Sequence, residues 1–168
     1  MAGWLKITVS IIVVLVAGWY LIYYNTSNAG YTPEQPVAFS HKLHAGDNHI
    51  PCLYCHYNVE RSPRATVPSM NVCMGCHSMV AVNKEPIEAI TKIYEESHSV
   101  EWVKVYDLPD FVHFDHSRHI ARGFSCQTCH GQVERMMKLT QVRELNMGWC
   151  VSCHRDNDAP DDCSVCHQ

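Results

Sequence analysis

A chain of 168 residues is about the size of one domain, and its formal net charge of −4 gives no basis for binding nucleic acid. No Walker, Rossmann or Ser/His/Asp signature is present, so the sequence does not predict a nucleotide-dependent enzyme or a hydrolase. Ten cysteines and twelve histidines are far more than a chain of this length usually holds. Their spacing is therefore the most informative feature.

The N-terminus begins with a long apolar stretch. Residues 7–24, "ITVSIIVVLVAGWYLIYY", carry no charge and as a helix would extend about 27 Å, most of the way across a hydrocarbon core. Trp4 before the stretch and the aromatic residues near its far end resemble the two interfacial belts of a membrane span. We expect residues 1–25 to form a transmembrane signal anchor and residues 26–36 a linker. The alternative is a signal peptide cleaved near residues 27–29, "SNA".

Charge next to the apolar stretch predicts its orientation. Lys6 and the amino terminus are the positive charges near it, whereas the other flank, "NTSNAGYTPEQ", has none. The positive-inside rule then leaves the N-terminus in the cytoplasm. The sequence therefore predicts a single-pass protein of the cytoplasmic membrane, with everything after residue 25 on the periplasmic side.

All ten cysteines fall in one motif, C-x-x-C-H, which occurs five times. This motif attaches haem c, because the two thiols form thioethers with the vinyl groups and the adjacent imidazole binds the iron. Zinc sites and disulfides are the alternatives, but neither requires a histidine in the next position. We expect five covalently attached haem c groups. They would be held by Cys52, Cys55, Cys73, Cys76, Cys126, Cys129, Cys150, Cys153, Cys163 and Cys166, with His56, His77, His130, His154 and His167 as proximal ligands.

The exported part contains an internal repeat. "VAFSHKLHAGDNHIPCLYCH" at 37–56 parallels "VHFDHSRHIARGFSCQTCH" at 112–130, and each is followed by a second motif. This predicts two-haem modules at 37–77 and 112–154, an inter-module linker at 78–111 and a C-terminal fifth-haem segment at 155–168. With so few residues for each macrocycle, we expect a mostly irregular multihaem cytochrome c fold with short α-helices.

The linker between the modules has two periodic segments. Residues 85–97, "EPIEAITKIYEES", predict a short helix, since Pro86 suits a first turn and Ile87, Ile90 and Tyr94 share one face. Residues 100–106, "VEWVKVY", alternate as a strand does and are followed by the breaker "LPD".

Seven further histidines are available as second axial ligands. His41 and His44 occupy the same repeat positions as His116 and His119, and each pair is three residues apart. On a helical turn, two such side chains lie close enough to serve two neighbouring irons. We expect these four to be distal ligands.

The fifth distal ligand remains open in the sequence. Met147 and Met136 are the candidates we favour, because a thioether is a known axial ligand, although methionine beside a porphyrin is more often a packing residue. The other candidates are His113, which aligns with Ala38 in the repeat, and His98 and His49, which lie in polar surroundings.

Irons with both axial positions filled leave no vacancy for a substrate. The sequence therefore predicts an electron carrier without catalytic residues. The competing class is an enzyme such as a multihaem nitrite reductase, in which one iron keeps an open position.

At these residues the chain resembles known families. The V-x-F-x-H-x-x-H and C-x-x-C-H modules resemble class III multihaem cytochromes. The anchored five-motif set, with "LPDFVHFDHSRH", "CQTCHGQVERM" and "LNMGWCVSCHR", resembles the pentahaem cytochrome c subunit of bacterial alternative complex III. The resemblance implies a periplasmic relay that takes electrons from polytopic quinol-binding subunits and an iron–sulfur subunit related to molybdopterin oxidoreductases. It would pass them to a monohaem cytochrome c or a terminal oxidase.

Two other assemblies have subunits of similar form. The haem subunits of quinone-reductase complexes carry electrons in the opposite direction, and anchored multihaem quinol dehydrogenases bind quinol themselves. The apolar stretch has no ionisable residue in its interior to accept quinol protons, so we do not expect the isolated chain to oxidise quinol.

Overall fold

The computed structural model describes residues 2–167, and within that range it contains helices but no strands. The helices are α1 (Ala2–Thr26), η1 (Lys42–Asp47, a π-helix), α2 (Cys52–Cys55), α3 (Met70–His77), α4 (Glu85–Glu96), α5 (His116–Ala121), α6 (Cys126–His130), η2 (Val133–Arg135, a 3₁₀-helix), α7 (Met147–Asp156) and α8 (Cys163–Cys166). Most of the chain after α1 is irregular and lies between these short helices, as the sequence predicts.

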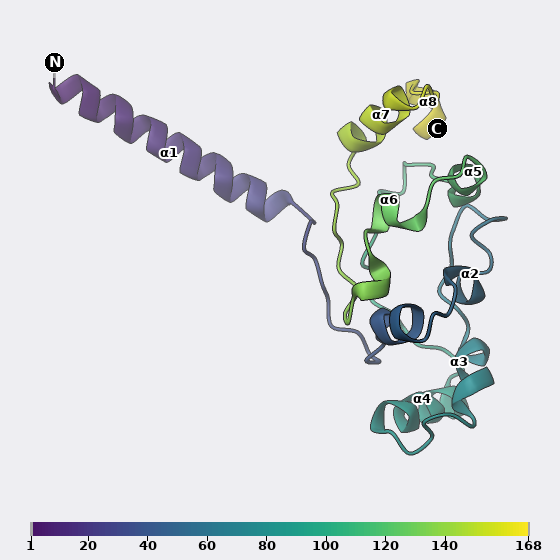
Figure 1. Cartoon of the computed structure of the whole chain (residues 1–168). Helices are drawn as coiled ribbons and strands as arrows, with labels where there is room; N and C mark the ends of the chain where they lie inside the picture. Colours follow the sequence, from purple (N-terminus) through teal and green to yellow (C-terminus); the bar gives the residue numbers. More distant parts are fainter. Residues whose placement is uncertain (1, 168) are drawn as a thin grey trace.

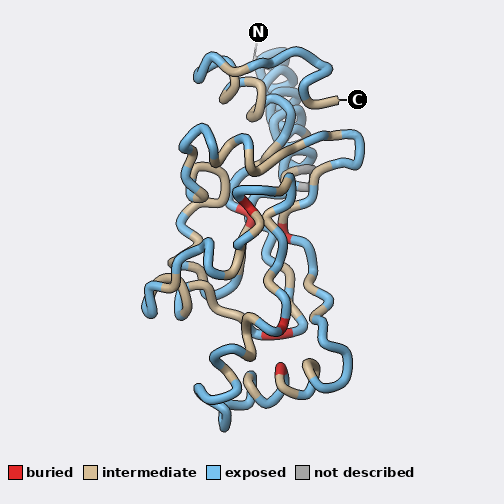
Figure 2. The backbone as a smooth tube through the Cα atoms, turned by 90° about the vertical axis from the view of Figure 1, so that its right-hand side faces the viewer, coloured by how far each residue is buried: buried red, intermediate tan, exposed pale blue. Residues whose placement is uncertain are grey.

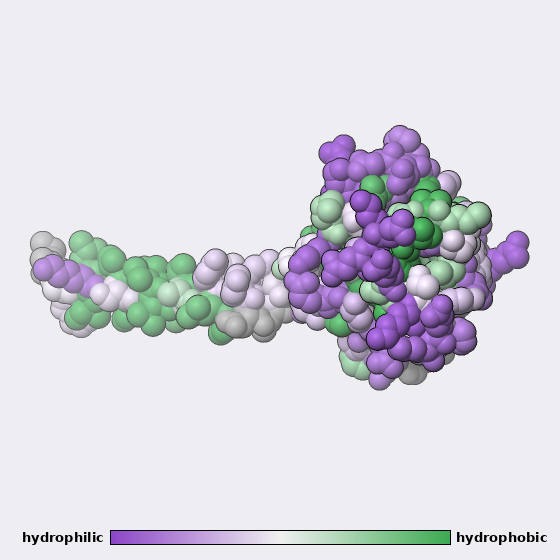
Figure 3. Space-filling model, turned by 90° about the horizontal axis from the view of Figure 1, so that it is seen from below, coloured by the Kyte–Doolittle hydropathy of each residue, from purple (hydrophilic) through white to green (hydrophobic). Residues whose placement is uncertain are grey.

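Helix α1 is the long apolar element expected at the N-terminus. Its segment Gly3–Tyr24 is long and apolar enough to cross a membrane, and none of it is buried against the rest of the chain. Figure 1 shows α1 projecting from the side of the remaining structure, and Figure 3 shows apolar surface along most of its length. Near its C-terminal end the rings of Trp19 and Tyr23 stack with centres 5.7 Å apart.

Hydrogen bonds fix the segment after α1 to the segment between η2 and α7. The amide of Gly30 donates to the carbonyl of Gln141 at 2.7 Å, and the amide of Gln141 donates to the carbonyl of Tyr31 at 2.9 Å. The hydroxyl of Thr32 donates to that of Thr140 at 2.8 Å. Gln141 is 7% exposed and is the one buried polar residue among those described. The segment that follows α1 is therefore attached to the second half of the repeat.

The rest of the chain is elongated. Figure 1 shows α3 and α4 at one end and α7 and α8 at the other, with α2, α5 and α6 between them. Within the described residues only five apolar side chains are buried, and Figure 2 shows how sparse and scattered they are: Val37, Val59, Met70, Ile90 and Val105. The polypeptide by itself makes little apolar core, which fits an interior built around large apolar macrocycles.

The predicted linker helix is confirmed as α4, which ends one residue earlier than expected. Its residue Ile90 is buried in a cluster with Val37 and Met70, and Ile87 and Tyr94 pack against that cluster. The apolar face of α4 therefore covers α3, which carries the second motif.

The predicted strand at 100–106 is wrong. The segment is irregular and has no partner strand, because a side chain takes the place of one. The side-chain amide of Gln35 donates to the carbonyl of Val103 at 2.9 Å, and its oxygen accepts from the amide of Val103 at 2.9 Å. Trp102 packs against the apolar cluster and Val105 is buried, so apolar side chains of the segment are covered without a sheet.

Candidate haem sites

Each C-x-x-C-H motif lies on a helical turn, which brings its cysteines to one side of the helix. The turns are α2, α3, α6, α7 and α8, and the histidine of the motif ends or directly follows the turn in four of them. All ten cysteines are free thiols and are exposed or half-exposed. Among residues 2–167 no three His, Cys, Asp or Glu side chains gather as metal ligands.

Thiols of different motifs lie near one another. Burial raises the pKa of Cys126, and the neighbouring thiol of Cys52 raises it further. The pKa of Cys55 is raised in the same way, first by burial and also by the thiol of Cys73. The pKa of Cys150 is raised by burial and by the thiol of Cys166. The attachment points are therefore close enough for the macrocycles to be neighbours.

The two halves of the repeat place their histidines in the same way. The ring of Phe39 lies edge-on to that of His41, with centres 4.9 Å apart, and stacks on that of His44 at 4.4 Å. The ring of Phe114 lies edge-on to His116 at 4.7 Å and beside His119 at 4.6 Å. One phenylalanine thus fixes both predicted distal imidazoles of its module, even though η1 is a π-helix and α5 an α-helix.

Three proximal imidazoles each face one of these distal imidazoles. The ring centres of His44 and His77 are 6.0 Å apart, those of His116 and His130 are 6.3 Å apart, and those of His119 and His154 are 6.0 Å apart. A metal-bound imidazole nitrogen lies about 2.0 Å from the metal and the ring centre about 1.1 Å beyond it, so two rings coordinating one iron have centres about 6 Å apart. The observed spacing fits an iron between the two rings of each pair.

His41 is left as the partner of His56. Burial, together with the neighbouring imidazoles of His56 and His44, lowers the pKa of His41 to about 4. The ring is therefore neutral near pH 7, which is the form that binds a metal. Its Nδ1 atom is buried and has no hydrogen-bond partner.

Seven of the histidines donate a hydrogen bond from Nδ1 to a backbone carbonyl. The pairs are His44 with Ser40 (2.9 Å), His56 with Thr66 (2.7 Å), His77 with Val80 (3.1 Å), His116 with Pro63 (2.8 Å), His119 with Asp115 (2.8 Å), His154 with Pro160 (2.5 Å) and His167 with Phe111 (3.2 Å). A carbonyl can only accept, so each Nδ1 carries the proton and each Nε2 keeps its lone pair for a metal.

His130 is oriented by rings. Tyr106 lies edge-on to it with centres 4.5 Å apart, and His116 lies nearly parallel to it, with an interplanar angle of 7°. Burial, together with the imidazoles of His116 and His56, lowers the pKa of His130 to about 4. This ring is also neutral near pH 7.

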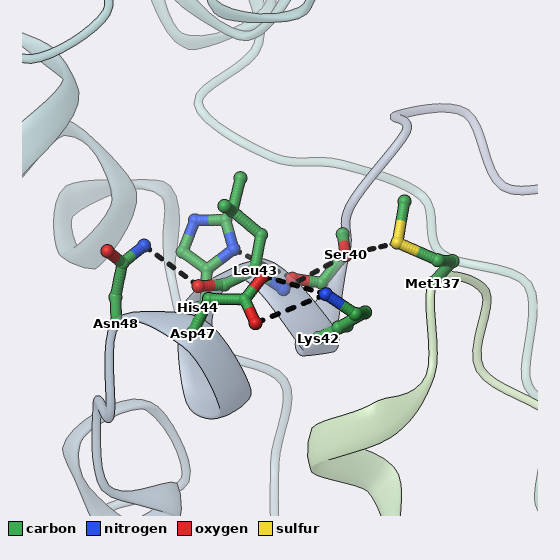
Figure 4. A network of polar contacts seen from close by, with 7 residues as sticks. All are labelled: Ser40, Lys42, Leu43, His44, Asp47, Asn48 and Met137. Carbon is green, nitrogen blue, oxygen red and sulfur yellow. Dashed lines mark hydrogen bonds and ion pairs between the residues drawn. The ribbon is translucent and has the colours of Figure 1, made fainter.

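Polar contacts close the turn that carries His44 (Figure 4). The Lys42 ammonium donates to the Asp47 carboxylate at 2.9 Å, and the Leu43 amide donates to the Ser40 hydroxyl at 3.1 Å. The same hydroxyl contacts the sulfur of Met137 at 3.4 Å. The turn therefore holds His44 at a fixed position between the first and second motifs.

An open cleft of about 470 Å³ lies between α3 and α4. It is lined by His77 and Met74 on one side and by Glu88, Thr91 and Lys92 on the other. Its position beside the proximal imidazole of the second motif suits one face of a macrocycle.

The fifth motif differs from the second, third and fourth. Among the ring contacts of residues 2–167, His167 lies 5.8 Å from Phe111 and faces no second imidazole. Met147 starts α7 and is 65% exposed. Met136 is half-buried beside η1, where its carbonyl accepts from the amide of Lys42 at 2.9 Å.

The remaining histidines of the sequence analysis are exposed. The amide of His113 donates to the carbonyl of Cys166 at 2.8 Å, which places its backbone beside the fifth motif. His49 and His98 both have positive φ angles, of 55° and 56°. Neither has a second imidazole beside it among the described ring contacts.

The groups that orient the ligands were not predicted from the sequence. Phe39 and Phe114 stood in the repeated V-x-F, so the repeat itself could have indicated them. The carbonyls of Pro63 and Thr66 lie in a stretch without any motif, and no signal in the sequence pointed to them.

Comparisons with known proteins agree with this geometry. A family model described as cytochrome c7 and related cytochrome c matches residues 112–168. The chain is also similar to the menaquinone reductase multihaem cytochrome c subunit of Nitratidesulfovibrio vulgaris, with 29% identity over 95% of this chain and 88% of that protein. The helical architecture is the predicted one, short helices with one N-terminal apolar helix, and both matches are to c-type cytochromes, a class that binds haem covalently.

Proposed function

We propose that this multihaem cytochrome is the membrane-anchored electron-transfer subunit of a quinone-linked respiratory complex. The observation that carries the proposal is the pairing of imidazoles at a spacing of 6.0 to 6.3 Å, which suits irons whose two axial positions are both filled. Such irons have no position for a substrate. A carrier role follows, rather than catalysis at an open haem.

Five haem c groups would be held by the ten motif cysteines and by His56, His77, His130, His154 and His167. His41, His44, His116 and His119 would be the distal ligands of the first four, in that order. When bound, each haem supplies an iron that takes up and releases one electron without a proton or a change of bonds. The chain's own residues orient the imidazoles, and burial lowers the pKa of His41 and of His130 so that these two rings are neutral near pH 7.

For the fifth iron we propose a thioether from Met147 or Met136. Met147 lies on the helix of the fourth motif, and Met136 lies beside the first repeat. Met147→Leu and Met136→Leu separate the two. The substitution that removes the ligand will make one iron per chain bind carbon monoxide in the reduced state, and the other will leave the spectrum unchanged.

Helix α1 would anchor the chain in the cytoplasmic membrane with the motifs on the periplasmic side. Lys6 on the N-terminal flank supports this orientation through the positive-inside rule. The exposed apolar surface of α1 would contact lipid or the helices of partner subunits.

Two kinds of complex suit the chain, and each has its own supporting observation. The quoted motifs resemble alternative complex III, where a related iron–sulfur subunit and polytopic quinol-binding subunits would be the donors and a monohaem cytochrome c or an oxidase the acceptor. The similar chain of N. vulgaris is named as part of a menaquinone reductase, in which electrons would run toward the quinone.

Purification of the chain from native membranes tests the proposal. We expect an iron–sulfur protein and polytopic subunits to copurify, and the chain's mass to correspond to five covalently attached haems. The direction then follows from activity, since quinol reduces the haems in the first complex, whereas prereduced haems reduce a quinone in the second. Recovery of a haem-bearing chain alone, with a high-spin ferric signal from several irons, would contradict the proposal.

A further inference from the structure

The order of the motifs in space can be derived from contacts of the chain itself. Within the first module, Phe39 contacts both His41 and His44, which belong to the first and second motifs. Within the second module, Phe114 contacts both His116 and His119, which belong to the third and fourth. The first motif is therefore next to the second, and the third is next to the fourth.

The two modules meet through the loop after the first motif. In this loop the carbonyl of Thr66 accepts from Nδ1 of His56 at 2.7 Å. Three residues earlier the carbonyl of Pro63 accepts from the amide of His116 at 3.1 Å and from its Nδ1 at 2.8 Å. One short loop thus holds the proximal imidazole of the first motif and the distal imidazole of the third. The second motif has no such link among the described residues, because α3 packs against α4 at the far end.

The fifth motif joins at the opposite end. The carbonyl of Pro160 accepts from Nδ1 of His154 at 2.5 Å, and Arg155 pairs with Asp161 at 2.7 Å, so the chain leading to the fifth motif is fixed to the fourth. From the other side, the amide of His113 donates to the carbonyl of Cys166, and the carbonyl of Phe111 accepts from Nδ1 of His167. Figure 1 shows α7 and α8 together at this end.

We propose that the motifs form a single file in the order second, first, third, fourth, fifth, which begins at the α3/α4 end and finishes at the α8 end. The inference rests on the proposed function, because it assumes that haems occupy the motifs. Helix α1 leaves this file from its side. Each step along the file oxidises one ferrous iron and reduces its ferric neighbour.

A matched pair of substitutions on one turn tests the order. His41→Met and His44→Met each replace one distal imidazole by a thioether, which raises the midpoint potential of the first or the second centre. A centre that is reduced early carries one positive charge less while its neighbours titrate, and this lowers the midpoint potential of the nearest centre through Coulomb interaction.

The midpoint potential of the third centre is the quantity to follow. Its ferric EPR signal should be distinct because its imidazole planes differ by only 7°, compared with 70° and 50° in the pairs of His77 and His154.

In an EPR-monitored redox titration of the full-length holoprotein, His41→Met should lower the midpoint of the third centre and His44→Met should leave it in place. A larger shift from His44→Met, or equal shifts, would overturn the order. If either variant fails to assemble, the iron positions in a cryo-EM map of the native complex decide, since the first and third irons should be nearer than the second and third. Either failure would leave the proposed function standing, because that rests on haem content, axial ligation and copurifying subunits.

Discussion

The imidazoles of His116 and His130 lie nearly parallel, with ring centres 6.3 Å apart, although the two residues come from different helices. Each ring is fixed by its own neighbour, since Pro63 accepts from Nδ1 of His116 and Tyr106 lies against His130. The spacing is therefore a property of the folded chain. Two rings held in this way fix the position of an iron between them.

Removal of one distal imidazole should open one iron. We expect His116→Ala to convert one low-spin ferric centre into a high-spin centre, because among the described ring contacts no other imidazole faces His130. Added imidazole should restore the low-spin EPR signal. His49→Asn is the control, since His49 is exposed and asparagine tolerates its positive φ of 55°. An unchanged spectrum for His116→Ala would contradict the assignment of this ligand.

The side chain of Asn146 caps α7, the helix of the fourth motif, by accepting from the amide of Trp149 at 2.9 Å. Asn146→Ala should lower the free energy of unfolding by about 1 kcal/mol, the usual value of such a cap. Asn146→Asp keeps the acceptor and should cost much less. Thermal unfolding followed by circular dichroism measures both, and equal losses for the two variants would show that the cap has no role.

Gly46 packs against η2. A Cβ atom at this position would meet the carbonyl oxygen of Glu134 inside contact distance. We expect Gly46→Ala to force η1 and η2 apart and to destabilise the protein by about 1 to 3 kcal/mol, as overpacking does. The matched control is Gly148→Ala, where the new Cβ would meet only Asn146 at 3.5 Å. Chemical denaturation curves should separate the two variants, and similar midpoints would be evidence against close packing of η1 on η2.

Gln35 replaces a partner strand for the segment around Val103. Gln35→Ala removes two hydrogen bonds of 2.9 Å, each of which contributes about 0.5 to 1.5 kcal/mol. The amide of Val103 should then exchange with solvent faster, by about tenfold if one such bond controls its opening. Hydrogen–deuterium exchange by mass spectrometry reads this peptide directly. Glu34→Ala, one residue away, removes only the ion pair with Lys138 and should leave Val103 protected.

Residues whose spacing carries chemistry were predictable from the sequence. The five motifs, the four histidines of the repeat and the apolar N-terminal helix were all identified from local patterns. The structure places His44, His116 and His119 each beside one motif histidine. The helix at 85–96 was predictable for the same reason, since its apolar face has the helical period.

Features that depend on distant parts of the chain were not predictable. The alternation at 100–106 signals burial of apolar side chains, and it does not say whether the backbone pairs with a strand or with the side chain of Gln35. The inferred order of the motifs depends on the hydrogen bonds that the carbonyls of Pro63 and Thr66 accept. Because every residue has a backbone carbonyl, the sequence does not show which ones accept. The fifth distal ligand stays a prediction for a similar reason, because neither Met147 nor Met136 belongs to the repeat.

The central claim is that paired imidazoles leave each of the first four irons no free axial position. The most direct measurement is a titration of the reduced, undenatured full-length protein with carbon monoxide, followed in the Soret band and referred to total haem. We expect at most one carbon monoxide for every five haems, from the fifth iron alone. Binding at two or more irons per chain would contradict the account.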